Sequence, residues 1–82
     1  MPNKARDPSS TYQRRFGARL RMRRIDCGYD TVAAFAQAIG EHPETYRTYE
    51  TGIRWPKPHT LAKIAEKLDV SLDYLIMGRT PG

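Results

Sequence analysis

The chain has 82 residues, of which 39% are hydrophobic, so it can form one small domain with a core of modest size. No apolar run approaches the roughly 20 residues that a membrane-spanning helix needs, and the first residues lack the apolar segment of a secretory signal. The single cysteine, Cys27, can form neither an internal disulfide nor a metal site by itself, which favours a reducing, cytoplasmic setting.

The charge of the chain is positive and unevenly distributed. The chain carries 14 Lys and Arg against 9 Asp and Glu, a net charge of +5. Residues 1–24 hold eight basic residues and one acidic residue, whereas residues 25–82 hold six basic and eight acidic residues. Clustered arginine in a chain with a pI near 9.7 is typical of proteins that bind polyanions. A solvated helix face with a basic tail explains the same pattern.

Residues 1–10 show no hydrophobic periodicity and contain two prolines, so we expect a flexible basic arm. Ser10 with Gln13 fits a capping box and predicts a helix from about Thr11. Gly28 is expected to end this helix. Four residues at helical spacing are expected to face the core: Phe16, Leu20, Arg24 and Cys27.

Two short helices are predicted next, separated by a tight turn. Asp30 or Thr31 caps the second helix, and Gly40 ends it. Its inward stripe is Val32, Phe35, Ala36 and Ile39. Pro43 begins the third helix, where its missing N–H costs nothing, and Gly52 ends it. The inward residues of the third helix are Tyr46, Tyr49 and Glu50.

The last two predicted helices begin at Pro58 and after Ser71. Asp69 is expected to take the left-handed position that ends the fourth helix, and Gly78 ends the fifth. The inward residues of the fourth helix are Leu61, Ile64, Ala65 and Leu68, and the fifth helix carries apolar Leu72, Leu75 and Ile76.

These elements predict an all-α fold of five short helices within residues 11–78, followed by a tail at 79–82, because no segment alternates with the period of a strand. Within it, residues 31–52 read as a capped helix, a tight turn and a second short helix, which is the anatomy of a helix-turn-helix. Small Ala36 allows the two helices to approach closely. Four residues of the second of these helices point outward, where a DNA major groove could meet them: Pro43, Glu44, Arg47 and Thr48.

Four segments carry a more specific pattern. They are Phe16-Gly17-Ala18-Arg19-Leu20-Arg21, Phe35-Ala36-x-x-Ile39-Gly40, Thr45-Tyr46-Arg47-x-Tyr49-Glu50-x-Gly52-x-Arg54-x-Pro56, and Leu61-x-x-Ile64-Ala65-x-x-Leu68-x-Val70-Ser71-Leu72-Asp73-Tyr74-Leu75-x-x-Gly78. In these segments the chain resembles the phage-repressor (Cro/Xre-type) helix-turn-helix family. The resemblance implies a lambda-repressor-like fold and a sequence-specific transcriptional regulator. It also implies a recognition helix at about 43–50, double-stranded DNA as the partner, and a homodimer on a palindromic site.

The motif and the resemblance together yield a set of candidate DNA contacts. The set is Thr31, Gln37, Pro43, Glu44, Thr45, Arg47, Thr48, Arg54 and Lys57. Arg47 can reach a phosphate or a guanine edge, and Arg54 and Lys57 suit the DNA backbone. Arg24 and Glu50 fall on inward faces, where a charge needs a partner. Since the family has a similar bridge at these positions, we expect a structural ion pair between them.

Three residues favour a different function on the same fold. Pro43 has no side-chain donor, and Glu44 can accept only from cytosine N4 and is repelled by phosphate. Val32 stands where the family often has a glutamine that donates to phosphate. The alternative is therefore a protein-interaction module, antitoxin-like or adaptor, with weak or lost specific DNA binding. Its binding would depend little on salt, whereas DNA binding depends on it strongly.

The sequence predicts no enzyme, because no nucleophile and base stand at a catalytic spacing and no Gly-rich phosphate loop is present. Neither His42 nor His59 has partners at metal-ligand spacing, so no metal is expected. No cofactor and no small-molecule ligand are expected either. For self-association, the resemblance implies the fifth helix (residues 72–77), because dimers of the family more often use it, so we rank this surface first and the exposed pair Met22 and Ile25 second.

Overall fold

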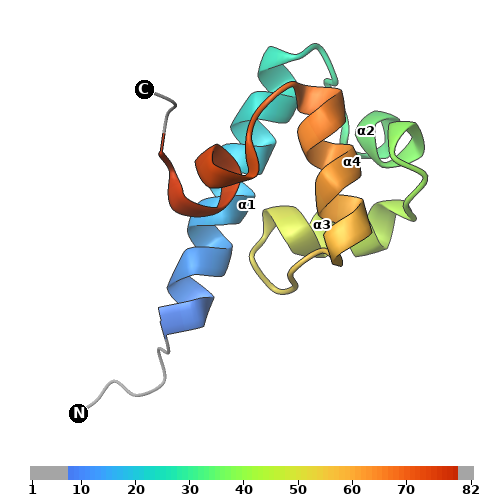
Figure 1. Ribbon diagram of the computed structural model, residues 1–82. Coiled ribbons are helices and arrows are strands. Elements are labelled where there is room, and N and C mark those ends of the chain that lie inside the picture. The colour runs from blue at the N-terminus through green and yellow to red at the C-terminus, as the bar shows by residue number, and fades with distance from the viewer. Residues whose placement is uncertain (1–7, 80–82) are drawn as a thin grey trace.

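The computed structural model describes residues 8–79, and Figure 1 shows their arrangement. In this range it contains helical elements and no strand: α1 (Pro8–Asp26), α2 (Val32–Ala38), α3 (Pro43–Glu50), α4 (Pro58–Leu68) and η1 (Asp73–Met77). The expected all-α fold of five helices is therefore confirmed. No helix of the described range is long and apolar enough to cross a membrane.

The helix α1 begins earlier than the sequence predicted. It starts at Pro8, so the expected start near Thr11 and the capping box at Ser10 are wrong. Proline favours this start, because its fixed φ already suits the first turn of a helix. The last three residues of the expected arm are thus helical, and residues 1–7 lie outside the described residues.

The inward face of α1 is as expected except at its end. Phe16, Leu20 and Arg24 are buried, whereas Cys27 is exposed. Cys27 follows Asp26, the last residue of α1, and is not part of the hydrophobic core. Its sulfur lies 3.7 Å from the carbonyl oxygen of Leu68, at the rim of the fold.

The unit formed by α2 and α3 is fixed by local signals in the sequence. The Thr31 hydroxyl accepts a hydrogen bond from the Ala34 N–H (3.1 Å), and Nδ1 of His42 accepts one from the Glu44 N–H (3.2 Å). Both helices therefore start on a side-chain cap, which satisfies an otherwise free donor. Between them Gly40 adopts a φ of 71°, a left-handed conformation that glycine takes without steric cost.

The C-terminal elements combine two confirmed signals with one correction. Asp69 ends α4 in the left-handed conformation, with a φ of 53°, and the Ser71 hydroxyl accepts a hydrogen bond from the Tyr74 N–H (3.0 Å). The fifth helix, however, is a π-helical turn. It lies against α1, where Arg19 donates to the carbonyl oxygens of Leu75 (2.9 Å) and Ile76 (2.8 Å) (Figure 1).

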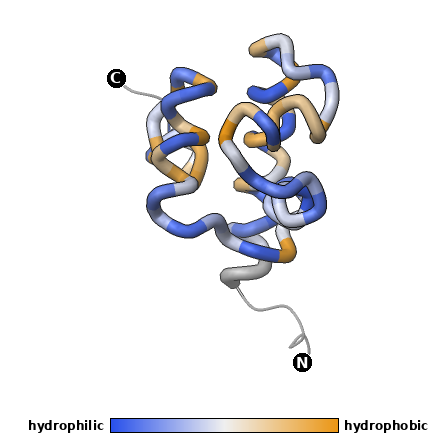
Figure 2. Tube along the Cα trace, turned by 90° about the vertical axis from the view of Figure 1, so that its right-hand side faces the viewer, coloured by the Kyte–Doolittle hydropathy of each residue, from blue (hydrophilic) through white to orange (hydrophobic). Residues whose placement is uncertain are grey.

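The core lies between α1 and the other helices, and most of the predicted inward residues fill it. In Figure 2 hydrophobic and hydrophilic positions alternate around the helices, as expected when one face is buried. Thr60, which the apolar stripe of α4 did not include, is buried as well. The buried apolar residues are Phe16, Leu20, Phe35, Ala36, Ile39, Tyr46, Tyr49, Ile64, Leu68 and Leu75.

Part of the basic charge of α1 holds the fold together. Arg19 binds η1, Arg23 donates to the carbonyl oxygen of Leu68 at the end of α4 (2.9 Å), and Arg24 is buried. Cations are favourable at helix C-termini because the last carbonyls lack partners there. The polyanion interpretation of the arginine cluster is thus too broad, since three of these arginines are already bound within the domain.

Candidate nucleic-acid interface

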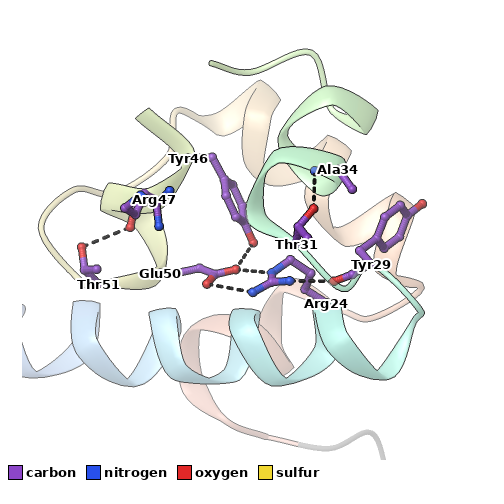
Figure 3. Close-up of polar contacts among 8 residues, drawn as sticks. All are labelled: Arg24, Tyr29, Thr31, Ala34, Tyr46, Arg47, Glu50 and Thr51. Carbon is purple, nitrogen blue, oxygen red and sulfur yellow. Dashed lines mark hydrogen bonds and ion pairs between the residues drawn. The ribbon is translucent and has the colours of Figure 1, made fainter. Parts of the chain in front are cut away.

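An ion pair at the centre of the domain sets the position of α3. Arg24 is only 4% exposed, and its Nε lies 2.6 Å from Oε2 of Glu50 (Figure 3). Its other nitrogens donate to Oε1 of Glu50 (3.4 Å) and to the carbonyl oxygen of Tyr29 (2.6 Å). Tyr46 donates from Oη to Oε2 of Glu50 (2.5 Å). The expected partners thus meet in a network that joins α1, the segment before α2, and α3.

This network changes the protonation of two of its members. The hydrogen bond to Glu50 raises the pKa of the Arg24 guanidinium, so Arg24 stays charged. Burial, and then the hydrogen bond that it donates to Glu50, raise the pKa of the Tyr46 phenol well above its ordinary value of 10. Tyr46 is thus held neutral, because a phenolate in this place would be poorly solvated and would face the Glu50 carboxylate.

Tyr46 is expected to make the domain less stable in alkali. A group whose pKa is higher in the folded state than in the unfolded state stabilises the fold fully at pH values below its unfolded-state pKa. This contribution is lost as the pH rises from the unfolded-state pKa through the folded-state pKa. For tyrosine the loss begins near about pH 10 and reaches about 1.4 kcal/mol per pH unit. Urea unfolding between about pH 8 and pH 11 should therefore show a steeper loss for the wild type than for Tyr46→Phe. Equal slopes would contradict the role of Tyr46.

The outward side of α3 is open to solvent. Glu44 and Arg47 are exposed, and their side chains form no hydrogen bond or ion pair with the described residues. Pro43 is half-buried at the start of the helix. Thr48 is half-buried too, and its hydroxyl donates to the carbonyl oxygen of Thr45 (2.6 Å).

The other candidate contacts fall into two groups. Thr31 and Gln37 are exposed on the first helix of the unit, Thr31 at its N-terminus. Thr45, Arg54 and Lys57 line one depression, of about 350 Å³, between α3, the loop after it and the start of α4. The structure brings these three residues together, and neither residue of the first group lines the depression.

Sequence reasoning did not foresee this depression. Five further residues line it: Glu41, Tyr49, Trp55, His59 and Thr60. Trp55 packs its ring on Phe16, with 5.2 Å between the ring centroids, and keeps part of its surface exposed. The aromatic and basic residues were visible in the sequence one by one. Only the folded loop shows that they share a surface.

Comparison with known proteins places this arrangement in a family. The family model HTH_3, described as helix-turn-helix, matches residues 20–75, more than half of the chain. The chain belongs to the helix-turn-helix family. The matched range begins within α1 and ends in η1, so it includes the α2–turn–α3 unit. The resemblance to Cro/Xre-type helix-turn-helix proteins is thereby confirmed.

One curated relative supports the same assignment to the helix-turn-helix family. The uncharacterized HTH-type transcriptional regulator YqaE of Bacillus subtilis (strain 168) is 42% identical over 50 residues. The match covers 61% of this chain and 43% of YqaE, so the chain spans less than half the length of this relative. The family consists of regulators rather than enzymes, in agreement with the expectation from the sequence. No solved structure gives a significant match to the chain.

Proposed function

We propose that the chain is a DNA-binding regulator of transcription that places α3 in the major groove. One observation carries the proposal: α3 is fastened on its inner side and open on its outer side. Tyr46, Tyr49 and Glu50 hold the inner side, whereas Glu44 and Arg47 face solvent. A recognition helix needs this division, because it must be rigid while its outward side chains meet base edges. Family membership and the relative's name support it.

The chemistry of the outward residues favours a particular base composition. Glu44 and Arg47 stand three positions apart, so they share one face of α3. A carboxylate accepts from cytosine N4, and a guanidinium donates to O6 and N7 of guanine. The methyl group of Thr48 suits thymine, and Pro43 contributes no hydrogen bond. We therefore expect the contacted bases to include a C·G pair.

Phosphate contacts would come from both sides of α3. The Thr31 hydroxyl already accepts from the Ala34 N–H, so its own proton is free for a phosphate oxygen. Gln37 and Thr45 can donate to neighbouring phosphates, and Arg54 and Lys57 supply positive charge after α3. These contacts would fix the register of the protein on the duplex.

A dimer of phage-repressor type would complete the proposal. Leu72 and Met77 expose apolar side chains at η1, and Met22 and Ile25 do so on α1. We place the two-fold axis at η1 and keep the α1 pair as the second surface. Half-sites about 34 Å apart on a palindromic operator follow from such symmetry. On this proposal the chain acts in the cytoplasm, in association with the nucleoid.

Arg47→Ala is expected to weaken binding to a specific site by about 1–3 kcal/mol and binding to random DNA much less. The site comes from selection out of a random duplex library, and affinities are measured at two salt concentrations. Arg21→Ala removes the same charge from an exposed position of α1 and is the matched control. Lys57→Ala should weaken all sequences alike and lower the salt slope by about one.

Two outcomes of this experiment contradict the proposal. If Arg47→Ala binds the selected site as tightly as the wild type does, α3 does not read the groove through this residue. If the wild type shows only weak, sequence-blind binding that disappears with salt, the basic residues make a purely electrostatic contact. The search should then turn to a protein partner, as the protein-interaction alternative predicts.

A further inference from the structure

The depression beside α3 has the size of a ligand site. Its volume of about 350 Å³ lies within the range of pockets that hold small organic molecules. It is framed by α3, the loop at 51–57 and the first turn of α4. Its lining combines aromatic rings, cations and one carboxylate. A ligand that uses all three must carry a flat ring, a negative charge and a hydrogen-bond donor.

One end of the depression is built for an anion. The helix α4 has no side-chain cap, and Pro58 has no N–H, so the N–H groups of His59 and Thr60 lack a partner within the described residues. The next N–H, that of Leu61, bonds to the carbonyl oxygen of Lys57 (2.9 Å). Free N–H groups at a helix start attract anions. Lys57 and Arg54 line the same depression and add positive charge.

Thr60 is a second, independent sign of a ligand. It lines the depression, and only 6% of its surface is exposed. Its hydroxyl forms no hydrogen bond with any of the described residues. Buried hydroxyl groups almost always have a partner. A ligand oxygen at the N-terminus of α4 would supply one, in the same place where the free N–H groups gather.

The other side of the depression offers aromatic surface. The Trp55 ring packs against Phe16 on one side, and Trp55 as a residue is 37% exposed. Tyr49 is buried, and its hydroxyl donates to Oε1 of Glu41 (3.4 Å). Phe16 holds the Trp55 ring before any ligand arrives, which lowers the entropic cost of stacking a flat ring on it.

We propose that this depression binds a small ligand that joins a flat ring to a phosphate group, with the size and chemistry of a nucleoside monophosphate. The phosphate lies at the start of α4 between Lys57 and Arg54 and accepts from Thr60. The ring stacks on Trp55, and Glu41 accepts from an amine or hydroxyl of the ligand. This ligand departs from the sequence-based expectation of none. Since Arg54 and Lys57 are also proposed DNA contacts, ligand and DNA compete, a consequence that rests on the proposed function.

The test uses Trp55 as its reporter, because it is the only tryptophan of the chain. AMP, GMP, CMP and UMP are titrated into the full chain without DNA while tryptophan fluorescence is recorded. At least one nucleotide should give a saturable change. Adenosine, ribose 5-phosphate and inorganic phosphate, which lack either the phosphate or the ring, should bind at least about tenfold more weakly. No saturable change with any nucleotide, or equal binding of inorganic phosphate, overturns the proposal.

Variants show whether binding occurs in this depression. Lys57→Ala and Thr60→Val should each weaken nucleotide binding by about tenfold, since each removes a donor to the phosphate. Lys67→Ala removes the same charge from the last turn of α4 and should leave binding unchanged. Urea unfolding checks that each variant is folded. If all three variants bind like the wild type, or if both lysine variants weaken binding equally, the site is not here.

A parallel measurement of DNA binding separates this inference from the proposed function. A chain that binds the nucleotide but no DNA supports the site and overturns the proposed function. A chain that binds a selected DNA site but no nucleotide overturns the site alone. Where both bind, addition of nucleotide should release DNA, and Lys67→Ala should respond as the wild type does. Simultaneous binding without mutual weakening overturns the competition.

Discussion

Glu50→Ala is expected to lower the free energy of unfolding by about 3–5 kcal/mol. The substitution leaves the Arg24 guanidinium buried without a counter-charge, and it also removes the acceptor of the Tyr46 hydroxyl. A buried cation cannot regain water without opening the domain. Since small domains are stable by about 5–15 kcal/mol, the substitution should remove a large share of the stability of the domain.

Urea unfolding at neutral pH measures this effect, and a double variant separates its causes. Arg24→Met combined with Glu50→Leu removes both charges and keeps apolar volume, so it should recover much of the lost stability. The single variant Arg24→Met leaves the Glu50 carboxylate with the Tyr46 hydroxyl and should lie between the two. A Glu50→Ala protein with wild-type stability would show that the pair contributes nothing to the fold. Recovery in the double variant would assign the loss to the unpaired charge.

The features that sequence reasoning predicted depend on signals confined to a few neighbouring residues. The Thr31 cap, the left-handed Asp69 and the start of α3 at Pro43 each follow from the chemistry of one short segment. The pairing of Arg24 with Glu50 is long-range, but two inward charges on facing helices had few other partners. The helix-turn-helix unit was predictable for the same reason, because caps and turns determine it.

The features that sequence reasoning missed depend on how distant segments of the chain pack together. Nothing near Arg19 or Arg23 indicates that they bind carbonyl groups at the ends of η1 and α4, more than 40 residues away. The depression likewise needs the loop after α3 to fold back over Tyr49. An arginine on a helix looks the same in a sequence whether it binds DNA, solvent or a carbonyl group. The candidate DNA contacts therefore stay predictions, whereas the packing of α3 is visible in the structure.

Gly17→Ala is expected to destabilise the domain by about 2–3 kcal/mol, although helix propensity alone predicts a gain of about 0.5–1 kcal/mol. Gly17 lies in the middle of α1, where alanine is normally the better residue. In the folded structure the expected effect of Gly17→Ala on stability changes from a gain to a loss. A Cβ at this position would clash with the carbonyl oxygen of Glu50 and would lie 2.7 Å from that of Tyr49. Both are backbone atoms, so no side chain can rotate away, and α1 and α3 must separate.

Ala18→Gly is the matched control, because it exchanges the same two residue types at a position of α1 where no backbone clash occurs. Ala18 is exposed one position further along α1, so the reverse substitution there should cost only the ordinary loss of about 1 kcal/mol. Urea unfolding of both variants measures the two effects, and a stabilised Gly17→Ala would show that α1 and α3 do not touch at this point.

The folded fraction of Gly17→Ala also tests the role of α3 in DNA binding. Because Tyr49 and Glu50 form the last turn of α3, a shift there moves Arg47 as well, so binding to a selected DNA site should fall more than binding to random DNA.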